Sequence, residues 1–309
     1  MQHRSPTEFG GRTPPSRRAM LMMAAATLML PAAACDRKPE PKVEPKAPEV
    51  PSGPPEGTLE WAVEGPWRVA DRGRDQWRHP METLRFFGLQ PRMTVVDFWP
   101  GSGWYSEILA PYLARGGGTY YAVGYPTGPG ADPAQAALVA NYEQRFTADK
   151  KLYGEVKFSA FGATTGPVAP AASADLALFM RNIHVWMAAG IAEKAFADAF
   201  DALRPGGILG VEQHRLASDK DQDPAAANGY VQEAFVRQLA AEAGFVFVAA
   251  SEINANATDT KDHPFGVATL PPQRLTATQG AEPDPAFDRA KYDAIGESDR
   301  MTLKFRKPE

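Results

Sequence analysis

One stretch of ten residues decides the fold: Thr94-Val95-Val96-Asp97-Phe98-Trp99-Pro100-Gly101-Ser102-Gly103. The run before Pro100 is apolar and β-branched apart from Asp97, so we expect a short buried strand there. Gly101 and Gly103 then permit a turn in which the backbone comes close to a ligand. Apolar residues at helical spacing follow, and the N-terminus of that helix would present unpaired N–H groups beside the turn. The stretch therefore predicts a strand, a glycine turn with a ligand site, and a helix.

Strands and helices alternate over the rest of the chain. Strands are expected at residues 94–99, 119–124, 156–161, 175–180, 207–213, 245–250 and 301–305, and helices at 108–116, 133–152, 190–203 and 230–243. Amphipathic N-terminal helices are expected to turn Trp61, Trp67 and Trp77 toward the core. Such alternation implies βαβ units with right-handed crossovers, and hence an α/β fold with a doubly wound, mostly parallel seven-stranded sheet. Ligands of these sheets bind at the carboxyl ends of the strands, where the strand order reverses.

The first 35 residues resemble an export signal. Residues 1–18 are basic, an apolar run of 16 residues follows at 19–34, and the run ends at Cys35, the only cysteine of the chain. The run is shorter than the roughly 20 residues of a membrane-spanning helix. We interpret residues 1–34 as a signal peptide. Arg17-Arg18 resembles a twin-arginine signal, with a general secretory signal as the alternative.

Ala32-Ala33-Ala34-Cys35 resembles a bacterial lipobox. This resemblance implies cleavage before Cys35, lipidation of that residue, and a lipid-anchored protein on the periplasmic side of a bacterial membrane. Residues 35–58 are rich in Pro, Lys and Glu and are expected to form a semi-rigid tether, with a folded domain at 59–309. Cleavage would change the net charge from -4 to -7. Nucleic acid is therefore disfavoured as a partner, and a small-molecule substrate is favoured.

Several segments of the domain resemble class I S-adenosylmethionine-dependent methyltransferases, and most closely a group of bacterial, often exported, predicted methyltransferases. The segments are Arg78-His79-Pro80, Phe86-Phe87-Gly88, residues 96–105, Arg181-Asn182-Ile183-His184, residues 203–207, Glu212-Gln213-His214, Asp262-His263-Pro264 and residues 296–301.

The resemblance implies S-adenosylmethionine as cofactor, bound by Asp97, Trp99, Gly101, Ser102, Gly103 and Tyr105, with Asp97 near its amino group. The chain departs from the superfamily at two places. Trp99-Pro100 replaces the first glycine of the loop and its neighbour, and Gly124-Tyr125-Pro126 stands where an acidic residue usually holds the ribose. These departures favour an alternative, a non-catalytic small-molecule-binding protein on the same fold.

Three histidines follow expected strands: His184, His214 and His263. The carboxyl ends of parallel strands meet at one edge of a sheet, so we expect these side chains to converge. In a methyltransferase His184 would be a general base for the acceptor, with Asn182, His214 and Glu212 as the other candidate catalytic residues. Alternatively the three histidines, with Glu212 or Asp262, would hold a transition metal in an envelope enzyme. No His-x-x-x-His spacing supports this second hypothesis.

Overall fold

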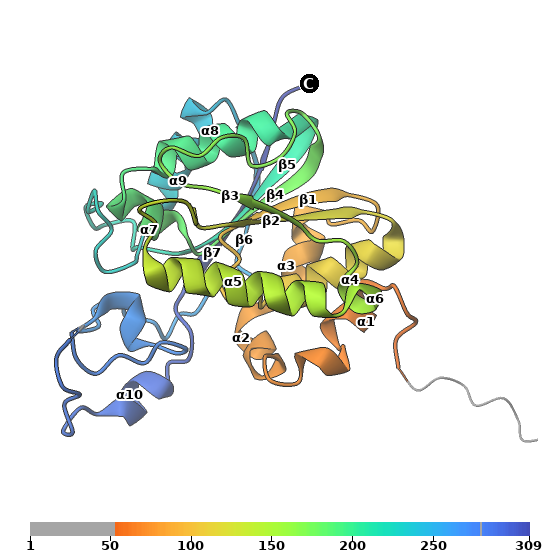
Figure 1. The fold of residues 1–309 in the computed structure, drawn as a ribbon. Helices are drawn as coiled ribbons and strands as arrows, with labels where there is room; N and C mark the ends of the chain where they lie inside the picture. Colours follow the sequence, from red (N-terminus) through yellow and green to blue (C-terminus); the bar gives the residue numbers. More distant parts are fainter. Residues whose placement is uncertain (1–52, 279) are drawn as a thin grey trace, which may run out of the picture. The chain divides into compact units, whose positions relative to one another are not determined.

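The computed structural model describes residues 53–278 and 280–309 (Figure 1). Cys35, Arg17-Arg18 and the predicted signal peptide lie outside the described residues, as does most of the predicted tether. The strands are β1 (Thr94–Phe98), β2 (Thr119–Gly124), β3 (Lys157–Ala160), β4 (Ala174–Met180), β5 (Leu203–His214), β6 (Val246–Ser251) and β7 (Arg300–Arg306). The α-helices are α1 (Leu59–Val63), α2 (Asp75–Arg78), α3 (Pro80–Phe87), α4 (Ser106–Gly116), α5 (Pro133–Ala148), α6 (Lys150–Tyr153), α7 (Ile183–Ala188), α8 (Ala192–Ala202), α9 (Glu233–Glu242) and α10 (Arg289–Asp293).

The seven strands form one sheet in the order β3-β2-β1-β4-β5-β7-β6. The pairs among β1 to β5 are parallel, whereas β7 runs antiparallel to both β5 and β6. The strand order reverses between β1 and β4, so a crevice opens beyond the carboxyl end of β1. The prediction of a doubly wound, mostly parallel sheet is confirmed, with an antiparallel β7.

Helices cover both faces of the sheet (Figure 1). On one face α7, α8 and α9 pack on a cluster that contains Phe98, Phe179 and Trp186. On the other face α1, α3, α4, α5 and α6 bury a second cluster around Leu109 and Phe146. Between residues 53 and 309, position 279 set aside, no helix is long and apolar enough to cross a membrane.

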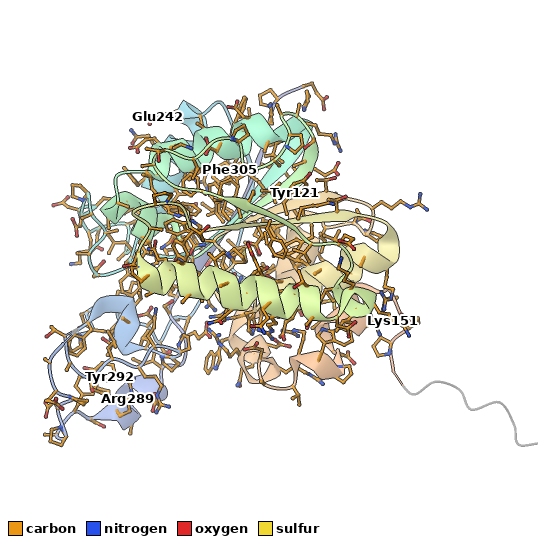
Figure 2. All side chains as sticks on the ribbon, viewed as in Figure 1. Tyr121, Lys151, Glu242, Arg289, Tyr292 and Phe305 are labelled. Carbon is orange, nitrogen blue, oxygen red and sulfur yellow. The ribbon has the colours of Figure 1, made fainter. Side chains whose placement is uncertain are left out.

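The largest departure from the predicted elements is the segment that connects β6 to β7. Residues 252–299 contain a 3-10 helix, Gly266–Thr269, and the short helix α10. Figure 2 shows Arg289 and Tyr292 on α10, where the Tyr292 ring stacks on Phe287 with centroids 5.1 Å apart. The predicted helix at 133–152 consists of two helices in the structure, α5 and α6. Asp149 separates them, because its side chain accepts a hydrogen bond from Leu152 N–H and so caps the start of α6.

Candidate ligand-binding cleft

A cleft opens where the carboxyl ends of β1, β4 and β5 meet. Its volume is about 390 Å³, within the roughly 300–1000 Å³ that is typical of small-molecule sites. Residues from the glycine turn, the ends of the strands, α2 and the segment 252–299 line it. Most of the predicted site residues meet here: Asp97, Trp99, Gly101, Ser102, Tyr105, Asn182, His184 and His214.

The glycine turn presents Gly101, but not Gly103, to the cleft. Both glycines have positive φ, 61° and 94°. A Cβ at Gly101 would meet nothing within 4 Å, whereas a Cβ at Gly103 would lie 2.4 Å from the Phe146 ring on α5. Gly103 is therefore required for packing of α5 against the turn, and Gly101 leaves the space open for a ligand.

Trp99 lines the cleft and also belongs to the apolar cluster around Phe98, Phe179 and Trp186. Its φ is 48°, a left-handed value that costs a non-glycine residue energy. The indole is held by a hydrogen bond from Nε1 to Phe161 O (3.0 Å) and by contact with the Tyr125 ring, centroids 4.3 Å apart. Asn182 fixes the same turn, because its Nδ2 donates to Phe98 O (2.8 Å) and Trp99 O (3.1 Å). Asn182 is thus a structural link between β1 and β4.

Asp97 has an unpaired oxygen at the cleft. The residue is 1 % exposed, and its Oδ2 accepts a hydrogen bond from Tyr120 OH (2.9 Å). Its Oδ1 is buried and has no hydrogen-bond partner among the residues the structure describes. Burial raises the pKa of Asp97 to about 7. A buried carboxylate oxygen without a donor is costly, so this position favours a ligand that supplies an N–H.

Four arginines and two glutamates form a buried to half-buried cluster at the cleft and below it. Glu297 accepts from Arg74 Nε (3.0 Å), Arg78 Nε (2.9 Å) and Arg300 Nη1 (2.5 Å). Glu212 is fully buried and accepts from Arg181 Nη1 (2.8 Å). Four positive charges thus face two carboxylates, and the cleft favours an anionic group.

Glu212, which the sequence predicts as a catalytic residue, does not line the cleft. A residue that acts on substrate would have to do so. Glu212 also accepts from Tyr105 OH (3.0 Å) and lies 3.1 Å from Arg300 Nε. Glu212 therefore anchors Arg181 and Tyr105, which do line the cleft. Arg181 itself adopts a positive φ of 66°, which this anchoring holds in place.

His184 and His214 lie together at the cleft, with ring centroids 5.3 Å apart. His214 Nδ1 is 2.5 Å from Ser298 Oγ, and His184 Nδ1 is 3.2 Å from Gln213 Nε2. Burial lowers the pKa of His184 to about 4 and lowers the pKa of His214 well below its usual range. Both rings are therefore neutral at pH 7.

The expected convergence of three histidines is wrong for His263. Its Nε2 is 2.8 Å from Asp259 Oδ1, and Tyr230 OH donates to the same carboxylate (2.9 Å). His263 is not at the cleft, because residues 252–299 fold back and bury it against Tyr292. Asp262 is exposed and bonds to Thr260. In the described parts of the chain no group of three or more His, Cys, Asp or Glu side chains is placed to hold a metal ion.

A second, narrow cavity adjoins the cleft at Trp99, Pro100, Gly101 and Tyr125. Its volume is only about 20 Å³, and Leu138 and Val139 of α5 with Phe158 of β3 give it apolar walls. The end of β2, Gly124 followed by Tyr125, supplies no carboxylate here, as the sequence indicates.

Sequence reasoning missed Arg74 and did not assign a role to Arg78, Arg181, Glu297 or Ser298. All four of the latter lie in segments that carry the methyltransferase resemblance. A signal was therefore present in the charged residues of those segments, whereas Arg74 lies outside them and its ion pair with Glu297 spans 223 positions of sequence.

Comparison with known proteins gives structural likeness alone: no family model and no curated protein sequence matches the chain. A S-adenosylmethionine-dependent methyltransferase from Aquifex aeolicus is 19% identical, with 61% of this chain and 90% of that one covered and a TM-score of 0.47. A putative sarcosine dimethylglycine methyltransferase from Galdieria sulphuraria is 12% identical, with 78% and 88% covered and a TM-score of 0.49. Human N-acetylserotonin methyltransferase, in complex with S-adenosylmethionine, is 15% identical, with 82% and 57% covered and a TM-score of 0.46. The part of the chain that the structure describes has an α/β fold with one seven-stranded, mostly parallel sheet.

Proposed function

We propose that the protein is a methyltransferase that transfers a methyl group from S-adenosylmethionine to a small-molecule acceptor. The observation that carries the proposal is the unpaired, buried Oδ1 of Asp97, which lies at a cleft that also holds an excess of arginine charge. An α-amino acid carries an ammonium group and a carboxylate. The ammonium group complements a protein carboxylate that lacks a donor, and the carboxylate complements guanidinium groups that lack a full set of acceptors. S-adenosylmethionine ends in such an α-amino-acid group.

The residues present fit the cofactor's amino-acid end best. Asp97 would accept from its ammonium group. Arg74 and Arg78 would donate to its carboxylate, since each uses Nε on Glu297 and no bond from their Nη groups is found in the described residues. Gly101 leaves room beside them. The narrow cavity at Trp99 and Tyr125 has room for about one water molecule, so it would have to widen to take the flat adenine ring.

When bound, S-adenosylmethionine supplies an electrophilic methyl group on a sulfonium sulfur. The protein's task is then to align the acceptor and exclude water. Pro271, Pro272 and Gln273 line the cleft from the segment 252–299, so they would shield it from solvent. His184 and His214 would contact the acceptor.

Calorimetric titration of the purified full chain with S-adenosylmethionine tests the proposal, together with the transfer of a labelled methyl group to a cell-envelope extract. Asp97→Asn should weaken binding by about 10- to 100-fold, because a hydrogen bond to a charged group contributes about 1.5–3 kcal/mol. Asp149→Asn is the matched control, since Asn caps a helix as well as Asp and this residue lies on the exposed start of α6. Absence of binding at millimolar cofactor would contradict the proposal.

A second candidate function, non-catalytic binding of a small molecule, has one structural observation in its favour. Trp99 and Tyr125 narrow the cavity beside the glycine turn, and no carboxylate stands at the end of β2. Binding of the cofactor without methyl transfer to any extract fraction would favour this candidate over the first.

We also propose export and lipid anchoring through Cys35. The support is the sequence pattern of residues 1–35. Mass spectrometry of the protein from membranes should find an acylated N-terminal cysteine, and Cys35→Ser should release the protein from the membrane fraction. An unmodified Met1 N-terminus in membrane-derived protein would contradict this proposal.

A further inference from the structure

The hydrogen bonds of Gln213 determine which nitrogen of His184 carries the proton. Gln213 is fully buried; its Oε1 accepts from Ile183 N–H (3.2 Å) and its Nε2 donates to Gly229 O (3.1 Å). A backbone N–H can only donate and a carbonyl can only accept, so the amide orientation is fixed. Nε2 also lies 3.2 Å from His184 Nδ1, and it can only donate. The lone pair of His184 is therefore on Nδ1.

His184 then presents an N–H to the cleft. In a neutral imidazole whose Nδ1 accepts, the proton is on Nε2. A second proton would have to be placed on Nδ1, opposite the amide N–H of Gln213. Burial lowers the pKa of His184 to about 4, which agrees with a ring that stays neutral. A general base needs a free lone pair toward its substrate, and His184 lacks one in this arrangement.

The charges near His184 discriminate between acceptor classes. Arg181 lines the same cleft, and Arg300 and Arg181 both lower the pKa of His214 beside it, after the larger effect of burial. Glu212 and Glu297 are already occupied by arginines, and the proposed function assigns Asp97, the remaining carboxylate named at the cleft, to the ammonium group of the cofactor. An amine becomes a cation when it is methylated, which these surroundings disfavour, whereas an oxygen anion is stabilised by them.

We propose, on the basis of the methyltransferase function above, that the acceptor is an oxygen acid, a phenol, enol or carboxylic acid, which binds as its anion and accepts a hydrogen bond from Nε2–H of His184. The acid loses its proton to solvent before it reacts. An oxygen lone pair forms the new O–CH₃ bond while the S–CH₃ bond breaks, and the bonding electron pair stays on sulfur, so the sulfonium becomes a neutral thioether. One negative and one positive charge are lost together. No base is needed in the step.

Two measurements on the full chain, made without any methyl donor, test this inference. In ¹⁵N-resolved NMR of the imidazoles, His184 should show the Nε2–H tautomer, and its signal should move when benzoate is added. Benzoate and benzylamine, which share a ring and differ in charge, serve as probes. Benzoate should bind at least about tenfold more tightly.

Two variants separate a donor from a base. His184→Leu removes the N–H and should weaken benzoate binding about tenfold. His184→Gln places an amide N–H near the position of Nε2 but cannot act as a base, and it should stay within about threefold of the wild type. An Nδ1–H tautomer, equal binding of benzylamine, or a His184→Gln chain as weak as His184→Leu would overturn the inference. If either variant fails to fold, the tautomer of the wild type still decides.

Failure of the inference can be told from failure of the proposed function. Calorimetry with S-adenosylhomocysteine reports only the cofactor end of the cleft. If S-adenosylhomocysteine does not bind but benzoate binds as expected, the methyltransferase proposal is refuted. If S-adenosylhomocysteine binds but the benzoate results differ from those expected, only the oxygen-acid acceptor is refuted.

Discussion

Replacement of Asp97 by Asn should change how the stability of the protein depends on pH. Burial raises the pKa of Asp97 to about 7 in the folded chain, against its ordinary value of 3.8. Between these two values the folded chain holds a proton that the unfolded chain has lost, so wild-type stability falls as pH rises through this window. From pH 5 to pH 8 the loss amounts to about 2.6 kcal/mol. Asn does not titrate, so the variant lacks this loss.

Urea denaturation of both chains at pH 5 and pH 8 measures the effect. Asp97→Asn should gain about 2.6 kcal/mol relative to the wild type between the two pH values, whatever its stability at pH 5. Glu107, whose pKa burial also raises to about 7, is present in both chains and cancels. Parallel pH dependence in the two chains would refute the argument that Asp97 is a buried carboxyl with an unpaired oxygen. A bound ammonium group favours the ionised carboxylate, so wild-type affinity for S-adenosylhomocysteine should rise as pH passes about 7.

Three further predictions concern the architecture of the cleft. Gly103→Ala should lower the free energy of unfolding by about 2–5 kcal/mol, because the new Cβ would collide with Phe146 and the residue has a positive φ. Gly101→Ala, which has the positive φ but no collision, should lower it by only about 1–2 kcal/mol. Equal losses in urea denaturation would contradict the assigned packing. Glu297→Gln leaves the buried Arg78 and Arg300 and the half-buried Arg74 short of a carboxylate, and it should cost about 3–5 kcal/mol. Glu56→Gln, in its exposed pair with Arg115, should cost less than about 1 kcal/mol. The midpoints of thermal unfolding would show this order, and a reversed order would be inconsistent with it. Asn182→Ala removes two hydrogen bonds, to Phe98 O and Trp99 O, and should lower the free energy of unfolding by about 1–3 kcal/mol and weaken the binding of S-adenosylhomocysteine. Unchanged affinity in calorimetry would show that the glycine turn does not need these hydrogen bonds.

The positions of the strands and the glycine turn could be predicted because they depend on local patterns. The run at residues 94–98 is apolar and β-branched, and the alternation of strands with helices leaves few topologies. Eight predicted site residues meet at the cleft for the same reason, since each lies near the carboxyl end of a strand or in the segment that follows it.

The rest of the site depends on contacts between residues distant in sequence. Arg78 and Glu297 are 219 positions apart, and nothing in either neighbourhood indicates the partner. His263 was expected at the cleft because it follows β6, but the segment 252–299 is too long for a simple turn and carries the ring to Asp259 instead. The role proposed for His184 depends on the amide of Gln213, whose orientation only the three-dimensional hydrogen bonds define.

Binding of S-adenosylhomocysteine compared with 5′-methylthioadenosine tests the central claim most directly. The two ligands share the adenosine, and only the first carries the amino-acid end that Asp97 and the arginines are proposed to hold. Calorimetry of the full chain should find S-adenosylhomocysteine bound at least about 100-fold more tightly, since an ammonium and a carboxylate each add a charge-assisted hydrogen bond. Equal affinities, or no binding of either ligand, would contradict the account.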